Sequence, residues 1–164
     1  MQGLAVAYED RCVRFASHEG TLIGVWRDPP NRPRASAVRA LQRRLMVGRP
    51  GIQALHVVVA GETSPLTLPD VDRNEMAEIV RALKGTQSTS AIAFEGSAFF
   101  VAAWRSIFSA VLLLLRPDYP LRVFSKREEA IAWLERVGAD RPGARTAADL
   151  TALVAEVERG LSPP

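Results

Sequence analysis

The sequence is poor in the side chains on which most metal and redox chemistry depends, with one cysteine and two histidines in 164 residues. A single cysteine, Cys12, cannot form a disulfide within the chain. Cys12 stands in an alternating run of polar and apolar residues that is typical of a β-strand, which indicates a structural cysteine rather than a reactive one. A chain of this length buries roughly two-thirds of its unfolded surface, so it needs neither a disulfide nor a metal to fold.

The sequence also lacks the usual signals for export and for membrane insertion. Residues 1–10 contain no basic segment followed by an apolar one, which a signal peptide would need. The most apolar stretch, residues 97–115, is interrupted by Arg105, so its uninterrupted runs are shorter than the ~20 residues of a membrane span. We therefore expect a cytoplasmic protein without a membrane span.

The charges are nearly balanced, with a net charge of +3, and the basic excess is local. Between residues 27 and 49, Asp28 is the only acidic residue among seven arginines, which are Arg27, Arg32, Arg34, Arg39, Arg43, Arg44 and Arg49. Such a cluster could bind phosphate groups. No aromatic residues interleave with these arginines, so we interpret the cluster as a solvated helix face and expect no nucleic-acid partner.

Alternating strand and helix patterns run along the chain and predict an α/β domain with a mixed sheet. The first two strands are separated by a turn at residues 18–20 and predict a hairpin. The predicted strands are 11–16, 21–26, 54–60, 90–94 and 121–124, and the predicted helices are 34–47, 72–83, 97–115, 125–137 and 146–160. The order is β-β-α-β-α-β-α-β-α with one appended helix. We predict the α/β domain over residues 1–139, and a linker with an amphipathic C-terminal helix over residues 140–164.

No familiar catalytic constellation is present in the sequence. The two histidines, His18 and His56, have no second ligand at metal-binding spacing, and His56 is expected to be a hydrogen-bonded core residue of a central strand. There is no glycine-rich phosphate loop between a strand and a helix, and no Gly-x-Ser-x-Gly motif. We predict that the protein is not an enzyme and that it uses no metal and no cofactor.

Two segments that follow predicted strands are candidate binding positions, because ligands of open α/β sheets bind at the carboxyl ends of strands. Glu95 ends one strand and is either a functional acid or a solvated glutamate. The loop with Glu62, Thr63 and Ser64 lies before a helix amino end that would favour a phosphate, and its alternative is a plain surface loop. Both remain open from the sequence alone.

The third predicted helix, residues 97–115, is apolar over more than half of its circumference when residues are placed at about 100° intervals. One face of a sheet would cover a narrower stripe, so this helix is expected to be covered on two sides, by another helix or by a second copy of the chain. We predict self-association through Val101, Trp104, Phe108 and Leu112.

The chain resembles the STAS fold of bacterial anti-sigma-factor antagonists in its order of elements and in two segments. Residues 122–134 are similar to the end of such domains, where a strand ending in Phe124 leads into a helix ending in Trp133-Leu134. Residues 94–107 are similar to a group of bacterial STAS-like proteins. The resemblance covers about residues 11–138.

In antagonists of this kind, an Asp-Ser-x-Gly motif after the third strand is the regulatory site. Here that place reads Gly61-Glu62-Thr63-Ser64-Pro65, which keeps the hydroxyl groups but not the Asp-Ser core or its glycine. The resemblance implies a non-enzymatic signalling or scaffold module that acts on a protein partner, including a second copy of itself. The alternative from another class is a small-molecule or anion-binding domain whose site lies at the strand ends near Glu62 and Glu95.

Overall fold

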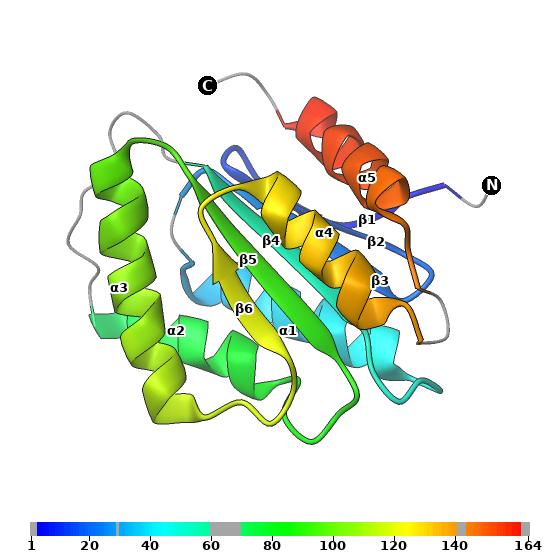
Figure 1. Ribbon diagram of the computed structural model, residues 1–164, viewed down its shortest axis with the longest axis horizontal. Helices are drawn as coiled ribbons and strands as arrows, with labels where there is room; N and C mark the ends of the chain where they lie inside the picture. Colours follow the sequence, from blue (N-terminus) through cyan, green and yellow to red (C-terminus); the bar gives the residue numbers. More distant parts are fainter. Residues whose placement is uncertain (1–2, 29, 60–69, 141–143, 162–164) are drawn as a thin grey trace.

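The computed structural model describes residues 3–28, 30–59, 70–140 and 144–161. They form one six-stranded mixed sheet with the strand order β1-β2-β3-β4-β5-β6 (Figure 1). Strand β2 pairs antiparallel with β1 and with β3, and β3 to β6 run parallel. The strands are β1 (Ala5–Glu9), β2 (Val13–His18), β3 (Thr21–Trp26), β4 (Gln53–Val59), β5 (Thr89–Glu95) and β6 (Leu121–Phe124).

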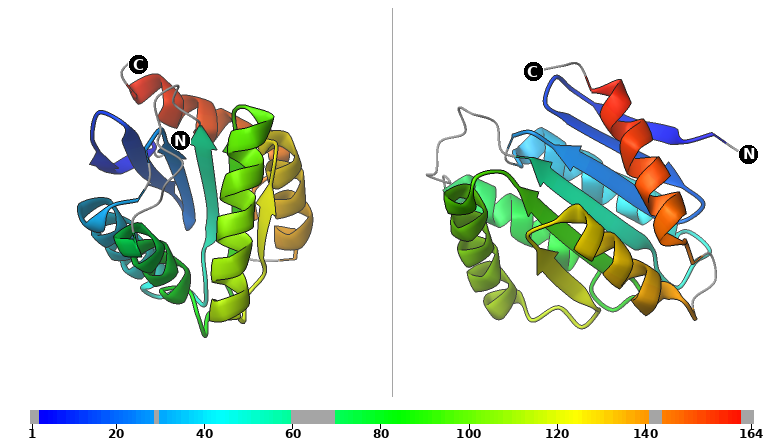
Figure 2. Two further views of the ribbon diagram at one scale, coloured as in Figure 1. Left: turned by 90° about the vertical axis from the view of Figure 1, so that its left-hand side faces the viewer. Right: turned by 45° about the horizontal axis from the view of Figure 1, so that its top comes forward.

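Five helices cover the two faces of the sheet, which makes three layers (Figure 2). Helices α1, α2 and α3 lie on one face, and α4 and α5 lie on the other. The helices are α1 (Arg32–Met46), α2 (Asp70–Arg81), α3 (Ala98–Leu115), α4 (Arg127–Gly138) and α5 (Ala147–Gly160). The predicted α/β class and the broad order of its elements are therefore confirmed.

Strand β1 was not predicted from the sequence. It is the outer strand of the sheet, its residues are mostly exposed, and its pairing with β2 is interrupted by a bulge between Val6 and Tyr8. An exposed, irregular edge strand buries little apolar surface, so it leaves a weak alternation in the sequence. The hairpin predicted from the later residues is present as β2 and β3, and β1 adds a second one before it.

Three predicted helix starts differ from the observed ones by two residues, and the other two differ by one. Helix α1 begins at Arg32 because Asn31 caps it, its side chain accepting a hydrogen bond from the amide of Arg34. Helix α2 begins at Asp70, so Asp72 lies inside the helix rather than at its cap. Helix α4 begins at Arg127, and Ser125, where the predicted helix starts, accepts a hydrogen bond from Arg105 on α3 at 3.1 Å.

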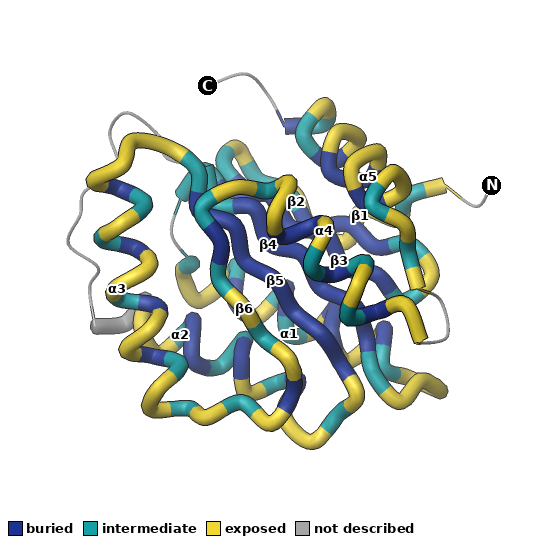
Figure 3. The backbone as a smooth tube through the Cα atoms, in the orientation of Figure 1, coloured by how far each residue is buried: buried dark blue, intermediate teal, exposed yellow. Residues whose placement is uncertain are grey.

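Helix α5 packs on strands β2 and β3 on the same face of the sheet as α4. Leu150 and Val157 are fully buried in this second core, and Val154 is 2% exposed. The guanidinium of Arg14 on β2 donates a hydrogen bond to the carbonyl of Val157 at 3.5 Å. The appended helix is therefore part of the packed domain in this structure, and Figure 3 shows its inner side as buried.

Gly24 on β3 provides the space in which three aromatic side chains meet. A Cβ atom at this position would lie 2.8 Å from Nδ1 of His56, 3.0 Å from Cδ1 of Phe15 and 3.1 Å from Nε1 of Trp26. Gly24 pairs with His56 across the parallel strands, so the absence of a side chain lets the imidazole and the indole come together above it.

Replacing Gly24 with Ala is therefore expected to lower the free energy of unfolding by about 1–3 kcal/mol, as overpacking of a core does. Urea unfolding of Gly24→Ala beside Gly3→Ala measures this, because a Cβ at Gly3 meets nothing within 4 Å. The control is expected to change stability by less than about 0.5 kcal/mol. Equal midpoints for both variants would show that the core yields to a methyl group at position 24.

Candidate functional site

The predicted loop residues Glu62, Thr63 and Ser64 lie outside the described residues. Glu95, the other strand-end candidate, is placed at the carboxyl end of β5, where it is held by Arg127 at the start of α4. The guanidinium Nε donates to both carboxylate oxygens at 2.8 and 3.0 Å, and Nη2 donates at 2.5 Å. Arg127 Nη1 also forms an ion pair with Glu158 on α5 at 2.7 Å.

This pairing explains the electrostatics of Glu95. Burial by itself would raise the pKa of the carboxyl group, but the hydrogen bonds and positive charge of Arg127 outweigh burial and lower the pKa below its ordinary value. The Glu95 carboxylate is therefore ionised and links β5 to Arg127 on α4. Arg127 in turn pairs with Glu158 on α5. Its geometry is that of a structural ion pair rather than of an available catalytic acid.

Helix α3 presents two different faces. Phe100, Trp104, Phe108 and Val111 are buried against the sheet and α2, and the rings of Trp104 and Phe108 lie 5.7 and 5.9 Å from the ring of Phe94. Val101 and Leu112 are half-buried beside them. Of the four residues predicted for self-association, Trp104 and Phe108 thus belong to the core of the same chain, and a second copy would have to contact the opposite face.

The outward side of α3 is exposed (Figure 3), and large apolar side chains lie on it. Phe99 is 69% exposed, Leu113 77% and Leu114 85%. Over its 18 residues α3 has a mean hydropathy of 2.0, and 22% of them are buried. By length and composition alone it is the one helix in the described part of the chain that could cross a membrane. From the sequence we expected Arg105 to leave apolar runs that are too short for a span. The exposed apolar area is unusual for a helix packed on a sheet.

A small cavity lies between the sheet and helices α1, α2 and α3, with a volume of about 50 Å³. The sheet contributes Trp26, His56 and Phe94 to its walls, and the helices contribute Gln42, Met76 and Trp104. The indole N–H of Trp26 donates to Nδ1 of His56 at 3.2 Å, as expected for a hydrogen-bonded core histidine. Burial lowers the pKa of His56 to about 4. We call this space the core cavity.

The remaining candidates for reactive chemistry are occupied or inert. Cys12 is partly buried, and hydrogen bonding to Asp28, together with burial, raises the pKa of its thiol, which disfavours the reactive thiolate. Among the described residues no group of three or more His, Cys, Asp and Glu side chains could hold a metal ion.

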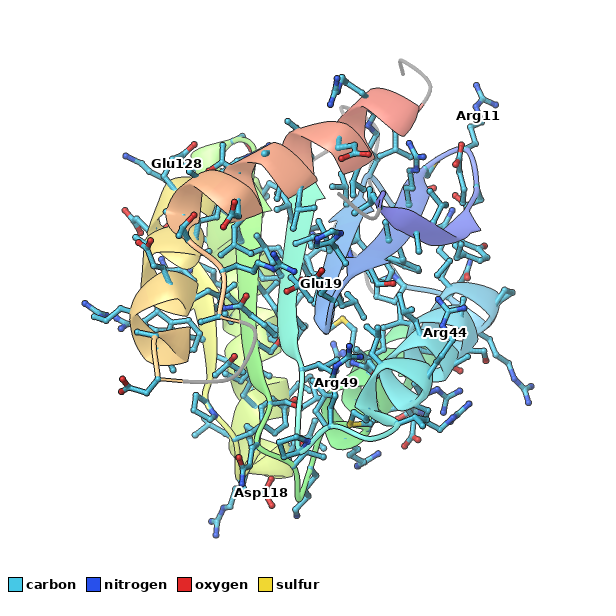
Figure 4. All side chains as sticks on the ribbon, turned by 90° about the vertical axis from the view of Figure 1, so that its right-hand side faces the viewer. Arg11, Glu19, Arg44, Arg49, Asp118 and Glu128 are labelled. Atoms are coloured by element: carbon cyan, nitrogen blue, oxygen red, sulfur yellow. The ribbon has the colours of Figure 1, made fainter. Side chains whose placement is uncertain are left out.

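The arginine cluster is partly neutralised by acidic residues. Arg34 pairs with Asp10 at 2.8 Å and with Asp28 at 3.5 Å, and Arg39 pairs with Glu78 at 3.3 Å. Arg49 and Glu19, both labelled in Figure 4, line a wider crevice of about 430 Å³ at the amino ends of the parallel strands. Ligands of open α/β sheets bind at the opposite ends of the strands, so this crevice is a weaker candidate than the core cavity.

Three features of the described residues could therefore carry function: the outer face of α3, the core cavity, and the ion-pair network around Arg127. The sequence indicated that α3 has more apolar surface than one sheet covers. It also singled out His56, which lines the core cavity, and Glu95, which belongs to the ion-pair network. It missed Gln42, Trp26 and Arg127, whose roles depend on contacts between distant segments. Compared with known proteins, the chain matches no family model, no curated protein and no solved structure.

Proposed function

We propose that this chain is a non-enzymatic interaction module, of the STAS-like kind that its element order resembles, and that it acts by pairing with a second copy through the outer face of α3. The observation that carries the proposal is a symmetric arrangement of residues on that face. Phe99, Ala102, Ser106, Ala110 and Leu113 fall within an arc of about 80° on the helix.

The spacing along this arc is three, four, four and three residues, so it reads the same in both directions about Ser106. When two copies of α3 pack antiparallel around a two-fold axis at Ser106, Phe99 of one copy meets Leu113 of the other. Ala102 then meets Ala110. Such a self-complementary patch is what an isologous dimer requires. Small residues at its centre let the helix axes approach closely, and the large residues at both ends fill the remaining space.

The charges near this face also favour a second copy. Arg105 is the only charged residue in α3, and its guanidinium is turned toward Ser125 on the β6–α4 connection. A two-fold axis at Ser106 brings Arg105 of both copies to the same flank of the interface, where this hydrogen bond directs each guanidinium to a residue of its own chain. An interfacial membrane helix would instead carry a row of Lys and Arg along its polar side.

The alternative function at the strand ends receives less support. Glu95 is held by Arg127, and Glu62 lies outside the described residues. A dimer formed through α3 leaves α4, α5 and the carboxyl ends of the strands accessible for a further protein partner. Regulation of such a partner is the signalling role that the STAS-like resemblance implies.

Replacing Ser106 with Asp is expected to convert a dimer into a monomer, because two carboxylates would meet at the two-fold axis in an apolar interface. Light scattering coupled to size-exclusion chromatography measures the mass of each variant. The matched control is Ala132→Asp on the exposed side of α4, which is expected to remain dimeric. Ser106 is exposed, so its substitution should leave stability within about 0.5 kcal/mol in the monomer.

A wild-type chain that stays monomeric at concentrations up to about 1 mM would contradict the proposal, since functional dimers hold together well below this. A Ser106→Asp variant that remains dimeric would place the interface elsewhere. Sedimentation of the monomer with phospholipid vesicles, abolished by Leu113→Asp, would show that the face of α3 binds a membrane surface instead.

A further inference from the structure

We propose that the core cavity is a binding site for a small, uncharged molecule that both accepts and donates a hydrogen bond, held between His56 on β4 and Gln42 on α1. This inference is independent of the α3 dimer. It rests on two buried polar side chains that line one cavity: Gln42, whose Oε1 has no partner among the described residues, and His56, whose Nδ1 is occupied by Trp26.

His56 supplies the donor. It is 6% exposed, and its Nδ1 accepts the indole N–H of Trp26. An indole N–H can only donate, so the single proton of the neutral imidazole is on Nε2. Burial keeps the ring neutral near pH 7. Among the described residues the hydrogen bond that His56 forms is the one accepted by Nδ1, and the ring lines the cavity, so Nε2–H is available to a ligand there.

Gln42 supplies the acceptor. Its side chain is 1% exposed, and its Nε2 donates to the carbonyl of Ile79 on α2 at 3.3 Å. That bond fixes the orientation of the amide and leaves Oε1 buried without a partner in the described part of the chain. An unsatisfied buried acceptor costs about 1–3 kcal/mol, so a ligand that donates to it recovers that free energy.

The walls select against charge. Besides these two residues the cavity is lined by Trp26, Phe94 and Trp104, and by aliphatic and sulfur-containing side chains of α2. Among the described lining residues Asp28 is the one ionised group, and its side chain, just after β3, is 44% exposed. Away from Asp28, a charged ligand buried here would have no counter-charge among the described lining residues.

The volume limits the size of the ligand. About 50 Å³ is space for roughly three or four water molecules, each of which needs about 10–15 Å³. A planar five-membered ring fits this limit, and the aromatic walls suit its faces. Ordered water could also satisfy His56 and Gln42, so the experiment has to separate a binding site from a hydrated void.

Pyrazole is a suitable probe, because it is a neutral ring with one N–H donor and one nitrogen acceptor side by side. Titration of the full chain is followed by the indole N–H signals of its tryptophans in ¹H–¹⁵N spectra, assigned with single Trp→Phe variants. Signals of Trp26 and Trp104, which line the cavity, are expected to shift saturably. The signal of Trp133, which packs on Phe124 on the other side of the sheet, serves as the internal control.

Thiophene has the same ring size without a strong hydrogen-bonding group. It is expected to bind the core cavity at least tenfold more weakly than pyrazole, because both hydrogen bonds are lost. In Gln42→Met and in His56→Phe the affinity for pyrazole should fall about tenfold, while that for thiophene should change little. Gln42→Met keeps the length of the side chain, so it decides the outcome if His56→Phe does not fold.

Equal binding of pyrazole and thiophene would overturn the proposal and leave an apolar void. Shifts of all three tryptophan signals together would show nonspecific binding, with the same consequence. The absence of nuclear Overhauser contacts between pyrazole protons and the side chains of Phe94 or Trp104 at saturation would show that the cavity holds water only.

Discussion

Deleting residues 144–164 is expected to abolish the cooperative unfolding transition and to give an aggregation-prone chain. Helix α5 covers the face of β2 and β3 that carries Ile23 and Val25, both of which are buried in the second core. A domain is stable by only about 5–15 kcal/mol, and truncating a single large core residue costs about 2–5 kcal/mol. The deletion removes several such residues together, so the summed loss of free energy is larger than the whole stability of the fold.

A milder change measures the same contact within the intact chain. Leu150 is fully buried, so Leu150→Ala is expected to lower the free energy of unfolding by about 2–5 kcal/mol. Ala155 lies on the exposed side of the same helix, and Ala155→Ser is the matched control with an expected change below about 0.5 kcal/mol. Urea midpoints and circular dichroism report both. A deletion variant that unfolds with the midpoint of the full chain would show that α5 is dispensable.

Acidification from pH 6.5 to pH 4 is expected to destabilise the protein by up to about 3 kcal/mol through His56. In the unfolded chain this imidazole binds a proton near its ordinary pKa of 6.5, whereas burial lowers its pKa to about 4 in the folded chain. Between these values the unfolded state holds more protons, so stability falls as the pH falls, and below about pH 4 the contribution becomes constant. Each unit of difference is worth about 1.4 kcal/mol.

The test compares unfolding free energies at several pH values for wild type and for His56→Phe. The variant should lose the slope between pH 6.5 and pH 4, while His18→Gln, at the other, partly exposed histidine, should keep it. Glu95 has a lowered pKa, so its contribution is present above its ordinary pKa and disappears only as the pH falls further. An unchanged slope in His56→Phe would assign the acid sensitivity to other groups.

The fold was largely predictable because its signals are local. The buried strands are short apolar runs, and α5, predicted as an amphipathic helix, carries a Thr146–Asp149 capping box and buries its apolar stripe. Helix α3 shows where such patterns become ambiguous. It is apolar on nearly every side, so its sequence could not tell that Trp104 and Phe108 face the sheet while Leu113 faces outward.

The candidate sites were less predictable because they join distant segments. Trp26 and His56 meet only because β3 and β4 pair in parallel with Gly24 opposite His56. Gln42 enters the same cavity from α1, where its neighbours in sequence are ordinary helix residues. Glu95 was correctly predicted at a strand end. Its partner Arg127 lies 32 residues later, so the sequence could not show that the Glu95 carboxylate is held in an ion pair.

The contact between α5 and the first strands has a consequence for how the chain folds during its synthesis. The hydrogen bond from Arg14 to Val157 joins residues 143 positions apart. Until residues 147–160 have left the ribosome, α5 cannot pack on its face of β2 and β3. Ile23 and Val25 on that face then remain exposed to solvent. Nascent chains with exposed apolar strands are substrates for chaperones and proteases. Slow translation before residue 147 should therefore lengthen the time for which this protein depends on them.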